Sequence, residues 1–131
     1  MLNVASVGAF GPLPGQASYG AAKAFVLSYT QSLGAELRGT GVSAATLCPG
    51  SVDTGFGDAA GFAKQDAEKM LPAVLWKSAE EVARAAVDGL ADGETVIVPG
   101  AFNRAAAVLY RLAPRRLLLP LLARSHPGAK S

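Results

Sequence analysis

The 131-residue sequence has little sulfur, little imidazole and no long apolar run. A single cysteine, Cys48, excludes an internal disulfide framework and is typical of a protein from the reducing cytoplasm. The single histidine, His126, and the lack of any metal-ligand spacing argue against a metal centre. No apolar run is long enough to span a membrane. No basic patch is interleaved with aromatic residues, so nucleic acid is not expected as a partner.

Acidic residues are missing from the last part of the chain. Residues 1–100 hold six Lys or Arg against ten Asp or Glu, whereas residues 101–131 hold six basic residues and no acid. We therefore divide the chain into a body, 1–100, and a basic, apolar helical tail, 101–131. The tail segment "LAPRRLLLPLLARS" is a candidate for peripheral contact with a membrane surface, its arginines at anionic headgroups. Packing on the sheet or on a partner subunit is the alternative.

The residues that are present favour one compact domain with alternating strands and helices. Half of the chain is apolar and 17% is charged, which predicts a buried core and no disorder. Short apolar runs alternate with longer periodic ones, and such alternation predicts a parallel sheet covered by helices on both faces. The expected fold is α/β, a Rossmann-type doubly wound sheet reduced to about three strands. We expect strands at 2–6, 42–48 and 94–100, and helices at 16–38, 64–71, 78–93, 101–112 and 115–124.

Local signals set the bounds of these elements. In the first long helix, apolar residues recur at spacings of three and four and give one stripe, formed by Ala22, Phe25, Val26, Tyr29, Leu33 and Leu37. Ser78 followed by Glu81 predicts a capping box. Pro114 and Pro120 are expected to interrupt the last two helices. Cys48 ends an apolar run, so we expect a small buried side chain there and no nucleophile.

Tyr19 and Lys23 are the first pair that suggests chemistry. They lie four residues apart in "SYGAAK", so a helix places them on one face, about 5–6 Å apart at Cβ. An ammonium close to a phenol favours the phenolate, which lowers the pKa of the phenol from about 10. A tyrosine adjusted in this way can act as a general acid or base near neutral pH. Taken alone the pair is a weak signal, because a surface pair has the same spacing.

Two further features strengthen this interpretation. Ser6 ends the first strand, 13 residues before Tyr19, at the carboxyl edge where open α/β sheets form their sites. The segment "CPGSVDTGF" follows the next strand at the same edge. Over residues 3–56 the sequence resembles the second half of a short-chain dehydrogenase/reductase. It matches that family's Asn-x-x-Ser strand end (Asn3 to Ser6), its Tyr-x-x-x-Lys helix and its Pro-Gly-x-Val-x-Thr loop, in order and at family spacing.

The resemblance implies a role for each matching residue. Tyr19 would be the general acid/base, and Lys23 would assist it and hydrogen-bond the nicotinamide ribose. Ser6 would hold the substrate oxygen. The residues expected to line the nicotinamide end of NAD or NADP are Pro49, Gly50, Val52 and Thr54. The implied reaction is hydride transfer between the cofactor and a carbonyl or secondary alcohol substrate. Residues 55–75 would be the substrate loop, and the 16–38 helix resembles the family's dimerising helix, which implies a homo-oligomer.

The family's dinucleotide-binding half has no counterpart in these 131 residues. The Gly-rich segment "GFGDAA", 55–60, follows a loop and does not open a helix directly after a strand, so we reject it as a pyrophosphate site. The family's upstream helix asparagine is also missing. We expect the chain to be a C-terminal piece of an oxidoreductase, inactive alone, because Met1 falls within a strand. The alternative is a short non-catalytic relative that serves as a dimerisation or membrane-surface module.

Overall fold

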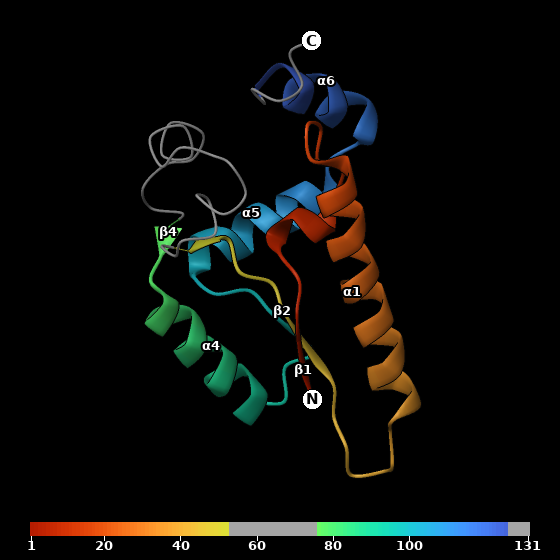
Figure 1. Cartoon of the computed structure of the whole chain (residues 1–131), viewed down its shortest axis with the longest axis vertical. Coiled ribbons are helices and arrows are strands. Elements are labelled where there is room, and N and C mark those ends of the chain that lie inside the picture. The colour runs from red at the N-terminus through yellow and green to blue at the C-terminus, as the bar shows by residue number, and fades with distance from the viewer. Residues whose placement is uncertain (53–75, 126–131) are drawn as a thin grey trace.

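The computed structural model describes residues 1–52 and 76–125 (Figure 1). Parallel strands are flanked by helices, as the alternation of apolar runs predicts. The elements are β1 (Leu2–Val4), a 3₁₀ turn η1 (Val7–Phe10), α1 (Ala17–Glu36), β2 (Ala45–Leu47), β3 (Ser51–Val52), β4 (Trp76–Lys77), α4 (Ala79–Ala91), β5 (Val96–Ile97), α5 (Ala101–Leu112) and α6 (Arg115–Ser125).

The main sheet is parallel and has the strand order β1-β2-β5. Leu2 stands opposite Ala45 in the first pair, and Leu47 stands opposite Ile97 in the second. Because β2 is central, its burial is complete along the strand, from Ala45 to Leu47. The fold class predicted from the sequence, an α/β parallel sheet, is confirmed.

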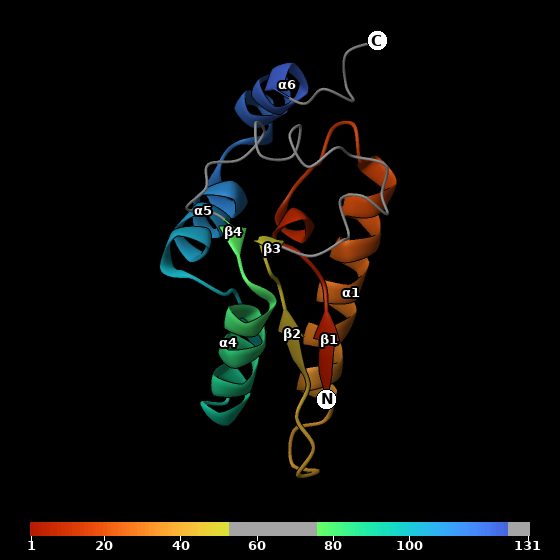
Figure 2. The same ribbon diagram turned by 60° about the vertical axis from the view of Figure 1, so that its left-hand side comes forward.

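Helices cover the two faces of this sheet with separate apolar clusters. Figure 2 shows α1 on one side of the strands and α4 on the other. On the α1 side, Leu27 packs with Cys48 and Val98. On the α4 side, Val82 and Ala86 pack with strand residues that include Ile97, which is 2% exposed. The strands therefore contribute alternate side chains to two cores, which explains their continuous apolar runs.

A buried hydrogen bond joins β1 to α1. The side-chain amide of Asn3 donates to Oγ1 of Thr30 at 2.9 Å, and the Thr30 hydroxyl donates to the carbonyl of Val26 at 2.7 Å. Thr30 is fully buried, so its hydroxyl needs both partners. This contact fixes the helix against the strand that ends at the site described below.

The three strands expected from the sequence are those of the main sheet, and β3 and β4 add a second, two-stranded parallel sheet. Two expectations from the sequence are wrong in detail. Pro120 lies inside α6 and does not interrupt it. The stripe on α1 is buried only in part. Its Val26 packs on the core, but Phe25 and Tyr29 are 68% and 54% exposed, and the buried residues of the helix are Gly20, Leu27 and Thr30. The expected 64–71 helix lies outside the described residues.

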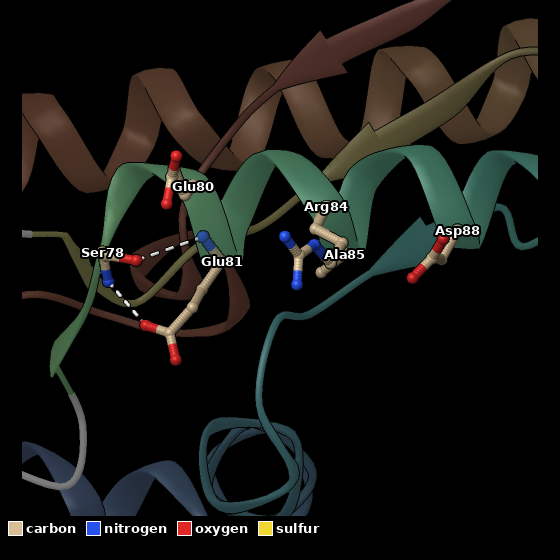
Figure 3. Close-up of a pocket in the computed structure, with 6 residues that line it drawn as sticks. All are labelled: Ser78, Glu80, Glu81, Arg84, Ala85 and Asp88. Carbon is tan, nitrogen blue, oxygen red and sulfur yellow. Dashed lines mark hydrogen bonds between the residues drawn. The ribbon is translucent and has the colours of Figure 1, made fainter.

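The start of α4 follows the predicted capping box. The Ser78 hydroxyl oxygen accepts from the backbone N–H of Glu81 at 3.2 Å, and the Glu81 carboxylate accepts from the backbone N–H of Ser78 at 2.8 Å (Figure 3). Gly93 ends the helix with a φ of 75°, a conformation that glycine adopts without strain. Among the described residues, no helix combines the length and the apolar character that crossing a membrane requires.

Candidate active site

The carboxyl ends of β1 and β2 lie side by side. Their pairing continues beyond the strands, as the Ala5 N–H donates to the Leu47 carbonyl at 2.7 Å and the Val7 N–H donates to the Pro49 carbonyl at 3.1 Å. Ser6 is therefore held next to the Pro49–Gly50 turn. This is the edge at which open parallel sheets place their ligands.

Ser6 starts the 3₁₀ turn that follows β1. Its Oγ accepts a hydrogen bond from the backbone N–H of Gly8 at 3.1 Å and so caps η1. The hydroxyl oxygen is the acceptor in this bond, which leaves the Ser6 O–H able to donate to another group. The turn fixes the direction of the side chain at the end of the strand.

Tyr19 and Lys23 lie together on the first turns of α1. The Lys23 ammonium is over the Tyr19 ring, with Nζ 5.6 Å from the ring centroid, as the spacing of four residues predicts. This is a cation–π geometry, in which the positive charge is attracted by the ring face. The two side chains are half-buried.

Gly8 is the point at which the serine and the tyrosine meet. A methyl group at this position would lie 3.6 Å from Ser6 Oγ and 3.8 Å from Tyr19 Cε1, and 3.3 Å from Cδ2 of Leu13, which is a tighter contact. The hydroxyl and the phenol ring thus border one small space beside Gly8, and the Leu13 side chain closes it further. The structure brings Ser6, Tyr19 and Lys23 together, although β1 and α1 are joined by a loop rich in proline and glycine.

The predicted cofactor loop lies beside this space. Pro49 and Gly50 are half-buried at the carboxyl end of β2, and Val52 belongs to β3. Thr54 lies outside the described residues. Gly50 packs against α5, because a side chain there would meet both Nδ2 and Oδ1 of Asn103 at 2.9 Å.

The buried face of helix α5 contacts two loops of the site. Asn103, which is 5% exposed, contacts Gly50 and donates to the Pro99 carbonyl at 3.3 Å. Two turns later, the Tyr110 hydroxyl donates to the Pro12 carbonyl in the loop between Ser6 and Tyr19. Burial raises the pKa of the Tyr110 phenol above its ordinary value of 10.0, and this effect outweighs the charge of Arg115, which lowers the pKa. The phenol therefore keeps the proton that it donates to Pro12.

Cys48 is a buried core residue, as predicted. Its side chain is fully buried, and burial raises the pKa of the thiol from 9.0 to about 11. The backbone N–H of Ser6 and the charge of Arg111 act in the opposite direction and are outweighed. A thiol that keeps its proton at neutral pH is a poor nucleophile.

The described residues also form two hollows, of which the second reaches Leu13 and Gly20, next to Gly8. One is on α4, the helix on the other face of the sheet from α1, and Figure 3 shows its lining residues, Ser78, Glu80, Glu81, Arg84, Ala85 and Asp88. The second is an apolar groove between α1 and α6, lined by Phe10, Leu13, Ala21, Arg115 and Leu119 among others. Neither is lined by Ser6, Tyr19 or Lys23.

Comparison with known proteins identifies the family of this chain. The family model described as short chain dehydrogenase matches residues 1–67, just over half of the chain. The chain belongs to the short-chain dehydrogenase family. The match covers β1, α1 and β2, the elements that carry the candidate residues.

Curated members of the short-chain dehydrogenase family match over part of their length. An uncharacterised oxidoreductase of Staphylococcus epidermidis is 39% identical over 79 residues, which are 58% of this chain and 34% of that protein. The 1-deoxy-11-beta-hydroxypentalenate dehydrogenase of Streptomyces exfoliatus is 48% identical over 54 residues, 41% of this chain and 20% of that one. The chain thus spans about a third or less of the length of these relatives.

Solved short-chain dehydrogenases share the fold over nearly the whole chain. A short-chain dehydrogenase from Sphingobium yanoikuyae, in complex with NADPH, is 28% identical with a TM-score of 0.66, over 94% of this chain and 42% of that one. One from Burkholderia cenocepacia, in complex with NADP, is 26% identical with a TM-score of 0.71, over 92% of this chain and 47% of that one. The likeness extends past the 67 residues of the family model into α4, β5 and the tail.

Asn103 and Tyr110 are site-bordering residues that sequence reasoning missed. With Ala107 they form the inner face of α5, at spacings of four and three. An asparagine in such a stripe indicates a contact with another polar group, because a buried amide requires hydrogen-bond partners. The sequence contains this stripe but does not indicate which loops it contacts.

Proposed function

We propose that these residues form the catalytic side of a nicotinamide-dependent oxidoreductase, which transfers a hydride between NAD or NADP and a carbonyl or secondary alcohol. The observation that carries the proposal is the shared space at Gly8, bordered by Ser6 Oγ and the Tyr19 ring, with the Lys23 ammonium over that ring. Family membership supports it, and so do the two structural neighbours that hold NADPH or NADP.

The residues present fit the nicotinamide end of such a cofactor. Lys23 offers an ammonium donor, and the Pro49–Gly50 turn gives a half-buried wall next to Ser6. Val52 extends this wall by its backbone, and Thr54, which lies outside the described residues, would add its hydroxyl. The cofactor, when bound, supplies the hydride chemistry.

Each of the three candidate side chains has its own role in the proposed reaction. Ser6 donates its O–H to the substrate oxygen and orients it. Tyr19 gives the proton to that oxygen when a carbonyl is reduced, and takes it from the alcohol in the reverse direction. Lys23 holds a positive charge over the ring, which stabilises the charge that develops on the phenol oxygen.

The test is a pair of tyrosine variants on one helix. The 131 residues are joined behind the dinucleotide-binding half of a family member, and NADPH oxidation is followed with a panel of carbonyl compounds. Tyr19→Phe is expected to lower kcat by about 10²–10⁴-fold while cofactor binding is kept. Tyr29→Phe, a matched change on the exposed side of α1, should leave kcat unchanged. Unchanged turnover in Tyr19→Phe would refute the assignment.

We also propose that the 131 residues alone bind the dinucleotide weakly and do not turn over. The reason is that, in the part of the chain that the structure describes, no Gly-x-Gly-x-x-Gly turn leads directly from a strand into a helix, where it could receive the pyrophosphate. Titration of the chain with NADH or NADPH, followed by nicotinamide fluorescence, measures this directly. Binding at micromolar concentration would contradict it.

A homo-oligomer through α1 is the proposed assembly. Phe25 and Tyr29 are exposed on this helix, with their rings stacked at 5.9 Å between centroids and 12° between planes. Small exposed side chains surround the two rings on the same face of the helix: Ser18, Ala21, Ala22, Ser28 and Ser32. Small residues allow close approach of a second helix, and the aromatic pair supplies apolar area. The single buried thiol supports a cytoplasmic location.

A further inference from the structure

Helix α5 exposes its apolar face. The exposed face repeats at spacings of three and four and consists of Phe102, Ala105, Ala106, Leu109 and Leu112. Leu109 and Leu112 are 71% and 76% exposed, and Phe102 is 58% exposed. The opposite face, with Asn103 and Tyr110, is the one turned to the loops of the candidate site. A helix at the surface of a soluble domain normally has the reverse arrangement.

Helix α6 continues the pattern. Leu119 lines the groove against α1 together with Arg115. Leu117 and Leu121, four residues apart and off that face, are 66% and 64% exposed. In Figures 1 and 2, α6 forms one end of the molecule and follows α5 directly. We call the exposed apolar residues of α5 and α6 together the tail face: Phe102, Ala105, Ala106, Leu109, Leu112, Leu117 and Leu121.

Both tail helices carry positive charge and no negative charge. They hold five arginines and no acidic residue, and all five are exposed: Arg104, Arg111, Arg115, Arg116 and Arg124. Arg111 lies over the Phe10 ring and Arg115 lines the groove against α1, whereas Arg116 and Arg124 flank Leu117 and Leu121 on α6. Helix α4 differs, because its exposed Val87 and Leu90 share the helix with Glu80, Glu81 and Asp88. Among the described helices, only those of the tail combine exposed leucines with arginines and no acidic residue.

We propose that the tail face docks on an anionic lipid surface, with α5 and α6 lying in the plane of the interface. Leucine and phenylalanine side chains would enter the boundary between headgroups and acyl chains, and Arg116 and Arg124 would contact lipid phosphates. A second copy of the chain is a poorer occupant, because a symmetric contact would bring Arg116 and Arg124 of each copy toward each other with no acidic residue of the two helices between them.

The test is co-sedimentation of the full chain with vesicles of phosphatidylcholine alone and of phosphatidylcholine with phosphatidylserine. The chain is expected to bind the vesicles that contain phosphatidylserine more tightly. Leu109→Ser with Leu112→Ser removes two of the apolar anchors, and Arg116→Glu with Arg124→Glu reverses two charges. Each pair is expected to lower partitioning into the anionic vesicles by at least about tenfold.

Matched variants on α4 control for unspecific effects. Val87→Ser removes an equally exposed apolar side chain, 65% exposed, and Arg84→Glu reverses an exposed charge; both should bind vesicles as the parent does. The proposal is overturned if the parent does not sediment with anionic vesicles, or if the α4 variants weaken binding as much as the tail variants. It is equally overturned if the Leu109/Leu112 variant binds vesicles normally but converts an oligomer to a monomer in light scattering. None of these readouts depends on turnover.

Discussion

Replacing Gly11 by alanine tests how α5 holds the loop between Ser6 and Tyr19. The φ of Gly11 is −171°, so its backbone accepts any residue and the change adds only a methyl group. That methyl group would lie 2.7 Å from Cε1 and 2.9 Å from Cζ of Tyr110, where ordinary contact begins at 3.4 Å. The ring must therefore retreat, and its hydroxyl is held at the same time by the Pro12 carbonyl.

The expected loss of stability follows from these two contacts. Forcing a methyl group into a packed site costs about 1–3 kcal/mol, and breaking one hydrogen bond costs about 0.5–1.5 kcal/mol. Gly11→Ala should therefore lower the free energy of unfolding by about 1.5–4.5 kcal/mol. Urea unfolding followed by circular dichroism measures this change. Tyr110→Phe, which removes only the hydroxyl, should cost about 1 kcal/mol.

A double-mutant cycle separates this steric effect from any other consequence of the substitution. In a Tyr110→Ala background the ring is gone, so Gly11→Ala should cost less than about 0.5 kcal/mol there. The reasoning is refuted if Gly11→Ala costs the same in both backgrounds. It is also refuted if the single variant is within about 0.5 kcal/mol of the parent.

Two further predictions concern the core and the α4 cap. Burial raises the pKa of Cys48 from 9.0 to about 11, so the folded state holds the thiol proton more tightly than the unfolded state does. The resulting stabilisation of the fold is complete below pH 9.0 and is lost as the pH rises toward 11. Unfolding measured at several pH values across this range should show that the free energy of unfolding falls more steeply with pH for the parent than for Cys48→Ala. Parallel curves of this free energy against pH would contradict the raised pKa of Cys48. Ser78→Ala should cost about 1 kcal/mol by removing the α4 cap, whereas Ser32→Ala, on the exposed side of α1, should be close to neutral in the same assay.

The periodicity of the sequence was enough to locate most elements of the main sheet and its helices. Short apolar runs alternate with longer runs, and glycine, proline and the Ser78–Glu81 pair mark where helices begin and end. Strands β3 and β4 are each a pair of residues, Ser51–Val52 and Trp76–Lys77, which is too short to show the alternation of a strand. Pro120 does not end α6, because its missing N–H removes one helical hydrogen bond without stopping the helix.

Burial on α1 could not be predicted from the pattern of its residues. Alanine, glycine and serine are distributed around the whole helix, so no face is distinctly apolar. Only packing against β1 and η1 decides that Leu27 and Thr30 point inward while Phe25 and Tyr29 face outward. In an open sheet the orientation of a helix depends on which strands lie beneath it.

The sequence by itself determined that Tyr19 and Lys23 share one helix face, since residues four apart on a helix are neighbours. The tertiary structure decided what borders that pair. Ser6 reaches Tyr19 because β1 pairs in parallel with β2 and a capped turn follows it. Asn103 and Tyr110 reach Gly50 and Pro12 from distant parts of the chain. Local spacing fixes neighbours within one helix, whereas contacts between distant segments depend on strand order and on which helix face the core accepts.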